Sequence, residues 1–170
     1  SKDMSNPTTR SWGKLKRLLR YLKGNPRYRL LYRYQSHPGE ISVWSDSDFA
    51  GCQKSRKSTS AGVLMLGGHV IKSWATNQAV LALSSGEAKY YGIVKAASVG
   101  IGARSLAADL GVEFSQSIAI KSDASAAIGV RNRIGIGKIR HIEVTQLWVQ
   151  EKVANGEIVI HKVPTESNLA

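Results

Sequence analysis

The strongest constraint on the fold is a β-hairpin signal followed directly by one long helical run. Two β-prone runs, at residues 58–66 and 69–75, are separated by Gly67-Gly68, a pair typical of a tight hairpin turn. The next run, residues 84–110, has a helical pattern and is apolar on most sides, which predicts burial against a sheet. A hairpin beside a long buried helix indicates an α/β domain.

The remaining elements extend this pattern. Further strands are expected at residues 40–46, 117–122 and 157–163, and further helices at 124–131 and 142–154, with a mobile loop at 135–137 between them. The predicted order is β-β-β-α-β-α-α-β. With 170 residues, of which 42% are apolar, the chain can fill one domain and a small appendage.

The appendage is a basic arm, expected over residues 1–36, before a domain at 37–170. Residues 1–35 contain ten basic side chains and one acidic one, and so carry nine of the twelve net positive charges. A helix is predicted from Thr8 or Thr9 to about Lys23, with Gly24 ending it. It has an apolar stripe of Trp12, Leu15, Leu18, Leu19 and Leu22 and a basic side that includes Lys14, Arg17, Arg20 and Lys23. That basic side is either a solvated surface or a phosphate-contacting one.

The net charge of +12 and a pI of about 10.0 favour a polyanionic partner, most often nucleic acid, over a merely soluble basic protein. One cysteine, Cys52, excludes an internal disulfide framework and fits a reducing compartment. Neither a signal peptide nor a long apolar run is evident, so we expect no membrane insertion and an intracellular location, in a cytoplasmic particle or the nucleus. The four histidines lack zinc-ligand spacing.

Three acidic residues, Asp46, Glu87 and Asp123, each fall at a predicted strand end or in a predicted first helical turn. Each has a structural explanation, since Glu87 can form a capping box with Ser84, Asp123 can cap a helix and Asp46 can hold an Asx turn. If they converge at one edge of a mixed sheet, their repulsion requires a cation, and hard oxygen ligands favour Mg²⁺ or Mn²⁺. Asp48 shares strand parity with Asp46 and is its rival as first ligand.

Several motifs in one order resemble the ribonuclease H domain of copia-type LTR retrotransposon polyproteins. They are Ser45-Asp46-Ser47-Asp48-Phe49-Ala50-Gly51, Arg56-Lys57-Ser58-Thr59-Ser60, Leu83-Ser84-Ser85-Gly86-Glu87-Ala88-Lys89-Tyr90, Ser122-Asp123-Ala124-Ser125, Arg140-His141-Ile142, and Val163-Pro164-Thr165-Glu166 with Asn168-Leu169-Ala170. The resemblance spans roughly residues 40–170. The arm resembles the tail of the polymerase, or connection, segment of the same polyproteins.

The resemblance implies a ribonuclease H-like α/β fold, a five-stranded mixed sheet flanked by helices. It also implies cleavage of the RNA strand of RNA–DNA hybrids, in partnership with the reverse transcriptase portion of the polyprotein. Two divalent ions would activate the attacking water and stabilise the leaving 3′ oxygen, with Asp46 bridging them and Glu87 and Asp123 completing their shells. Basic residues that position the phosphates would include those of the arm and Arg56, Lys57, Arg140 and His141. For His141 a structural hydrogen-bonding role is the alternative.

The sequence departs from the family pattern next to these ligands. The family usually has an acidic residue at the position of Lys89, a polar one at Ala124, and Thr or Ser at Gly86. Its fourth carboxylate directly follows the Asn-Leu-Ala motif, one position beyond Ala170, so we expect weak or absent activity for residues 1–170 unless Asp48 or Glu166 substitutes. The alternatives are a domesticated or decayed module that binds nucleic acid without cutting it, and a structural connection element.

Overall fold

The computed structural model describes residues 4, 6–27, 29–52, 55–123 and 143–170. The chain divides into two compact units, Ser1–Arg33 and Tyr34–Ala170. The first unit contains helix α1 (Thr9–Gly24), and the second contains the sheet and the other helices. The expected domain boundary between residues 36 and 37 remains a prediction.

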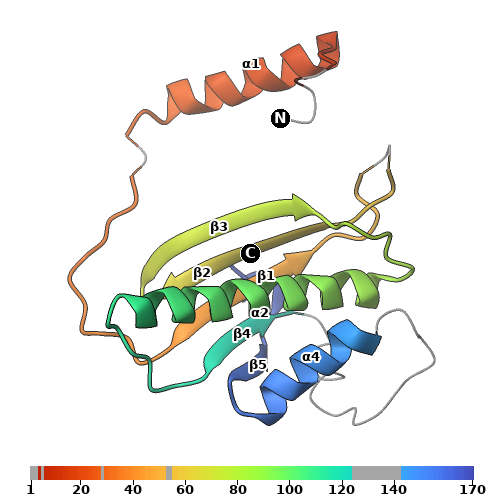
Figure 1. Cartoon of the computed structure of the whole chain (residues 1–170). Helices are drawn as coiled ribbons and strands as arrows, with labels where there is room; N and C mark the ends of the chain where they lie inside the picture. The colour runs from red at the N-terminus through yellow and green to blue at the C-terminus, as the bar shows by residue number, and fades with distance from the viewer. Residues whose placement is uncertain (1–3, 5, 28, 53–54, 124–142) are drawn as a thin grey trace. The chain divides into compact units, whose positions relative to one another are not determined.

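The second unit is built on one five-stranded sheet with the strand order β3-β2-β1-β4-β5 (Figure 1). Strands β1 (Ile41–Ser47), β2 (Thr59–Leu66) and β3 (His69–Asn77) form an antiparallel meander. Strands β4 (Ile118–Ser122) and β5 (Ile158–Lys162) join β1 in parallel. The sheet is therefore mixed, as predicted, and β1 lies at its centre between an antiparallel and a parallel neighbour.

Among the described residues of the second unit, two helices pack on one face of this sheet. Helix α2 (Ser85–Asp109) lies across the face, and α4 (Glu143–Ala154) lies beside β5 (Figure 1). The core between the helices and the sheet is aliphatic, because apolar residues of β1, β2, β4 and β5 point into it. Its members include Ile41, Val43, Leu64, Ile118, Ile120, Ile158 and Ile160 from the strands, and Ile93, Ala96, Ala97 and Val149 from the helices.

Two glycines let α2 approach the central strands closely. A Cβ atom on Gly100 would lie 2.8 Å from Ile118 Cγ2 and 3.1 Å from Val43 Cγ2, and one on Gly92 would lie 3.1 Å from Ser45 Oγ. Gly92 sits near the N-terminal end of the helix and above the end of β1. The first turns of α2 are therefore held against the strand ends where the candidate carboxylates lie.

The predicted hairpin turn is present and receives an unexpected support. Gly67 has φ of +57°, a conformation that glycine adopts without strain. The side chain of Gln35 clamps this turn, because its Nε2 donates to the carbonyl of Leu66 and its Oε1 accepts from the N–H of Gly68, at 2.8 and 2.9 Å. The start of the second unit is thereby tied to the β2–β3 turn.

The predicted elements agree with the structure to within two residues at most ends. Helix α1 is capped by Thr8, as expected, but it includes Gly24 as its last residue and has Asn25 as its C-cap. The predicted helix 124–131 and loop 135–137 lie outside the described residues. No helix in the described part of the chain is both long enough and apolar enough to cross a membrane.

Candidate active site at the ends of β1 and β4

Asp46 and Asp123 come from neighbouring parallel strands at the same level. Ser45 of β1 is in register with Ser122 of β4, so each aspartate is one residue beyond that pair. Asp46 has the strand parity of Trp44, whereas Asp123 directly follows the last residue of β4. The register therefore brings two of the three predicted carboxylates to the same end of two adjacent strands.

Glu87 lies in the first turn of α2 and is 7% exposed. Its N–H donates to Ser84 Oγ at 3.1 Å, so the predicted helix cap is real. Its carboxylate, however, accepts from the N–H of Leu83 at 2.8 Å, one residue earlier than in a capping box, and from Tyr91 Oη at 3.2 Å. Burial, followed by the charge of Glu87 and this hydrogen bond, raises the pKa of Tyr91. The structure therefore gives Glu87 a capping role in the turn that packs near the strand ends.

Asp123 is held by a cation from the same helix. Lys89 Nζ lies 2.9 Å from Asp123 Oδ1, and Thr165 Oγ1 donates to Oδ2 at 3.1 Å. The side chain of Asp123 is 8% exposed and that of Lys89 26%. Burial acts to raise the pKa of Asp123, but the hydrogen bonds from Lys89 and Thr165 and the charge of Lys89 outweigh it, so the pKa lies below its ordinary value. Sequence reasoning noted Lys89 as unusual but did not foresee this ion pair.

Asp48, the alternative to Asp46 as the first metal ligand, makes hydrogen bonds that stabilise the β1–β2 connection. Its Oδ1 accepts from the N–H of Thr59, and its own N–H donates to the carbonyl of Thr59 at 3.1 Å. The residue thus continues the β1–β2 pairing by one step beyond Ser47 and Ser60. Its exposed carboxylate closes the loop between the two strands.

Gln78 is a buried residue that the sequence analysis missed. Its Nε2 lies within 2.8–3.1 Å of Ser47 Oγ, Ser60 Oγ and the carbonyl of Ala88. Ser47 directly follows Asp46, and Ala88 directly follows Glu87. One amide therefore joins the ends of β1 and β2 to the first turn of α2. No sequence signal distinguished it from an ordinary polar residue after a strand.

The C-terminal segment reaches the same edge. Thr165, in the short 3₁₀ helix η1 (Thr165–Ser167), contacts Asp123, and Asn168 Nδ2 donates to the carbonyl of Ser45 at 3.1 Å. Ser45 immediately precedes Asp46. The Pro-Thr-Glu and Asn-Leu-Ala motifs, which the sequence marked only by resemblance, are thus attached to the two strands that bear the aspartates.

Comparison with known sequences relates the chain to transposon polyproteins. It is 29% and 28% identical, over 171 residues, to the retrovirus-related Pol polyproteins from transposons RE2 and RE1 of Arabidopsis thaliana, and 27% identical to that of transposon TNT 1-94 of Nicotiana tabacum. These matches cover 100% of this chain and 12–13% of each polyprotein. The chain therefore spans about an eighth of the length of these three relatives. No family model matches the chain.

Solved structures identify the fold. Ribonuclease H1 from a compost metagenome superimposes with a TM-score of 0.53 at 12% identity, over 76% of this chain and 88% of that one. Ribonuclease H1 of Halobacterium salinarum gives 0.50 at 14%, over 76% and 89%. The chain is homologous to copia-type polyproteins, and its fold is that of ribonuclease H. The predicted family resemblance and the predicted fold class are confirmed.

The carboxylates of this ribonuclease H fold suit a divalent ion by their chemistry. Their oxygen donors are those that Mg²⁺ and Mn²⁺ prefer, and Asp46 and Asp123 end adjacent strands. Yet within the described ranges no three acidic, histidine or cysteine side chains lie close enough to hold one ion together. The donors that would hold a metal are Asp46, Glu87 and Asp123, and Asp123 is already paired with Lys89.

The predicted phosphate-binding residues that the structure describes fall in two places. Arg17, Arg20 and Lys23 are exposed on α1. Lys14 is exposed on the same helix and also interacts with another group of the protein. Arg56 is exposed on the β1–β2 loop, with φ of +54°, and Lys57 Nζ donates to the carbonyl of Ala79. Arg140 and His141 lie outside the described residues. Of this set, Arg56 and Lys57 are on the loop that follows Asp48.

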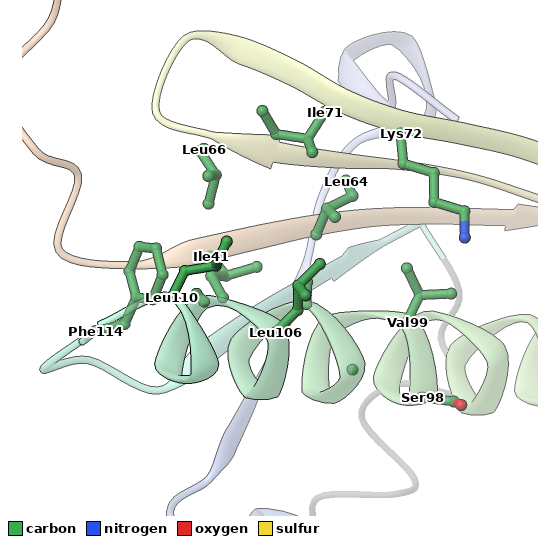
Figure 2. A pocket seen from close by; sticks show the side chains of 13 residues that line it. Ile41, Leu64, Leu66, Ile71, Lys72, Ser98, Val99, Leu106, Leu110 and Phe114 are labelled. Carbon is green, nitrogen blue, oxygen red and sulfur yellow. The ribbon is translucent and has the colours of Figure 1, made fainter. Parts of the chain in front are cut away.

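A separate hollow of about 690 Å³ lies at the other end of α2 (Figure 2). Its walls are mainly aliphatic and come from β1–β3, the C-terminal half of α2 and the segment that follows α2. They comprise Ile41, Leu64, Leu66, Ile71, Lys72, Ser98, Val99, Gly102, Ala103, Leu106, Ala107, Leu110 and Phe114. The lining has no carboxylate, and Val99 is twelve residues, or about 18 Å of helix, from Glu87. The hollow is therefore not part of the carboxylate site.

Proposed function

We propose that this domain is a divalent-metal-dependent endonuclease that cleaves the RNA strand of RNA–DNA hybrids during retrotransposon reverse transcription. The observation that carries the proposal is the shared register of β1 and β4, which brings Asp46 and Asp123 to the same end of adjacent strands in a ribonuclease H fold. The net charge of +12 supports a nucleic-acid partner.

The substrate class rests on similarity and on charge. One structural neighbour, the compost-derived ribonuclease H1, was solved in complex with an RNA/DNA hybrid, with a TM-score of 0.51 to this chain. A hybrid has an accessible minor groove with 2′-hydroxyl groups on one strand, which is how a protein tells RNA from DNA. Arg56 on the loop after Asp48 would position phosphates, and the basic side of α1 would add affinity that does not depend on sequence.

The roles of the chain's own residues follow from their places. Asp46 and Asp123 supply charged oxygen ligands at the strand ends, and Glu87 supplies a third from α2. Gln78 and Asn168 fix the backbone next to these ligands. When bound, a pair of divalent ions supplies the activation of water and the stabilisation of the leaving oxygen. The reverse transcriptase portion of the same polyprotein is the proposed partner, and an intracellular location remains part of the proposal.

Cleavage of a labelled hybrid tests this function. We expect any cleavage by the full chain, however weak, to act on the RNA strand of a hybrid in Mg²⁺, to stop in EDTA and to leave duplex DNA intact. Asp46→Asn should abolish cleavage without unfolding the protein. Asp109→Asn, which changes an exposed aspartate at the far end of α2, is the matched control and should cut at the unchanged rate. Cleavage that survives Asp46→Asn, or that proceeds in EDTA, would remove Asp46 from the mechanism.

A second candidate is a module that binds hybrids without cutting them. The ion pair between Lys89 and Asp123 favours it, because a carboxylate that is already neutralised by a lysine has less need of a metal. Hybrid binding with equal affinity in Mg²⁺ and EDTA, together with no cleavage at any metal concentration, would select this candidate over the nuclease.

A further inference from the structure

The contacts of Lys89 place a protein cation on one of the three candidate metal ligands. Lys89 is two residues beyond Glu87 on α2, and its ammonium group lies 2.9 Å from Asp123 Oδ1. Thr165 occupies the other oxygen of the same carboxylate. With 8% of its side chain exposed, Asp123 is a nearly buried charge whose described partners are a lysine and a hydroxyl group. An ion pair of this kind stabilises the site when no metal is present.

The same ammonium group opposes a metal ion electrostatically. An ion bound to Asp123 would lie within a few ångströms of Lys89 Nζ if the lysine stayed in place. Two like charges about 4 Å apart repel strongly in a partly buried site. Lys89 can avoid this, because 26% of its side chain is exposed and its four-carbon stem is flexible. Metal binding and the ion pair are therefore alternatives, and not additive interactions.

We propose that Lys89 is a resident counter-ion of the carboxylate site, which a divalent metal must displace before Asp123 can act as a ligand. The inference rests on the proposed metal-dependent function and adds a positioning residue to it. Metal binding becomes an exchange of one cation for another, in which the ion pair is broken. Breaking a hydrogen bond between charged groups costs about 1.5–3 kcal/mol. The wild-type affinity should thus be roughly ten- to a hundredfold weaker than that of a protein without the lysine.

The test measures metal binding and stability on the full chain, apart from any activity. Lys89→Met removes the charge and the donor but keeps a long side chain. Lys95→Met is the control, because Lys95 is an exposed lysine on the same helix. By titration calorimetry with Mg²⁺ alone, we expect Lys89→Met to bind at least tenfold more tightly than wild type and Lys95→Met to bind like wild type.

Thermal unfolding separates this role from a merely structural one. In EDTA, Lys89→Met should melt below wild type, because it leaves Asp123 charged without its cation. In saturating Mg²⁺ that deficit should vanish or reverse. An equal loss of melting temperature in both conditions would make Lys89 a structural residue and overturn the inference.

The outcomes also separate this inference from the proposed function. Equal Mg²⁺ affinity in wild type and Lys89→Met would overturn the role of Lys89, while cleavage that depends on Asp46 would leave the nuclease proposal standing. If neither protein binds Mg²⁺, the counter-ion role is wrong, because removal of the lysine should have opened the site. The cleavage assay with Asp46→Asn then decides the nuclease proposal by itself.

Discussion

Gln78 offers the sharpest test of how the fold supports the carboxylate site. Its two amide hydrogens serve three acceptors, Ser47 Oγ at 3.1 Å, Ser60 Oγ at 2.9 Å and the carbonyl of Ala88 at 2.8 Å. Gln78 itself is 8% exposed, so water cannot easily replace it. Truncation to alanine would leave buried acceptors without their donor next to both Asp46 and Glu87.

The size of the effect follows from these hydrogen bonds. Each buried hydrogen bond contributes about 1 kcal/mol net, and an unsatisfied buried acceptor costs about 1–3 kcal/mol. Because two hydrogens are shared among three acceptors, we expect Gln78→Ala to lower the free energy of unfolding by about 2–4 kcal/mol. The backbone bond from its N–H to the carbonyl of Ser58, at 2.8 Å, should survive the substitution.

Urea denaturation followed by circular dichroism measures this decrease. Gln116→Ala is the control, since Gln116 is exposed, and it should change stability by less than about 0.5 kcal/mol. Under conditions where both proteins remain folded, Gln78→Ala should also cut hybrids more slowly in Mg²⁺, because α2 and β1 are no longer joined beside their carboxylates. A decrease in stability for Gln78→Ala as small as that of the control would refute the assigned role of the amide.

Three further predictions concern the arm, the pH dependence and the packing of α2. Removal of Ser1–Arg33 should flatten the plot of log affinity for a hybrid against log salt, by about 0.7–0.9 for each phosphate that the arm neutralises, whereas an identical slope would show that the helix is only solvated. The pKa of Asp123 is lower in the folded protein than in the unfolded chain, where it is about 3.9. The ion pair of Asp123 therefore stabilises the protein above about pH 3.9, and this stability should be lost as the pH falls from there through the pKa of the folded state. In urea denaturation measured over a series of pH values, Asp123→Asn should remove this part of the pH dependence of stability. A pH dependence that Asp123→Asn leaves unchanged would contradict the prediction. Gly100→Ala should be less stable than Gly102→Ala by about 1–3 kcal/mol in thermal or urea unfolding, because both gain helix propensity but only Gly100 lacks room for a Cβ atom. Equal stability of the two variants would show that the close packing is easily relieved.

Local sequence was sufficient for the elements and for the rough place of the site. Alternating apolar residues mark the strands, and Gly67-Gly68 specifies the hairpin turn because glycine tolerates a positive φ. The same reasoning placed Asp46 and Asp123 at strand ends, because the apolar pattern of each strand stops at these polar residues. The resemblance then supplied the five-stranded mixed sheet, but the order of the strands within it came only from the tertiary structure.

Tertiary structure decided which polar groups meet. Lys89 and Asp123 are 34 residues apart, Gln78 and Ser47 are 31 apart, and Asn168 and Ser45 are 123 apart. No local pattern encodes such pairs, because each depends on how α2 and the C-terminal segment pack against β1 and β4. The sequence by itself determined that carboxylates stand at this edge of the sheet. Only the packing of α2 decided that one of them, Asp123, is held by a lysine, because the charge of a side chain is local but its partner is set by the fold.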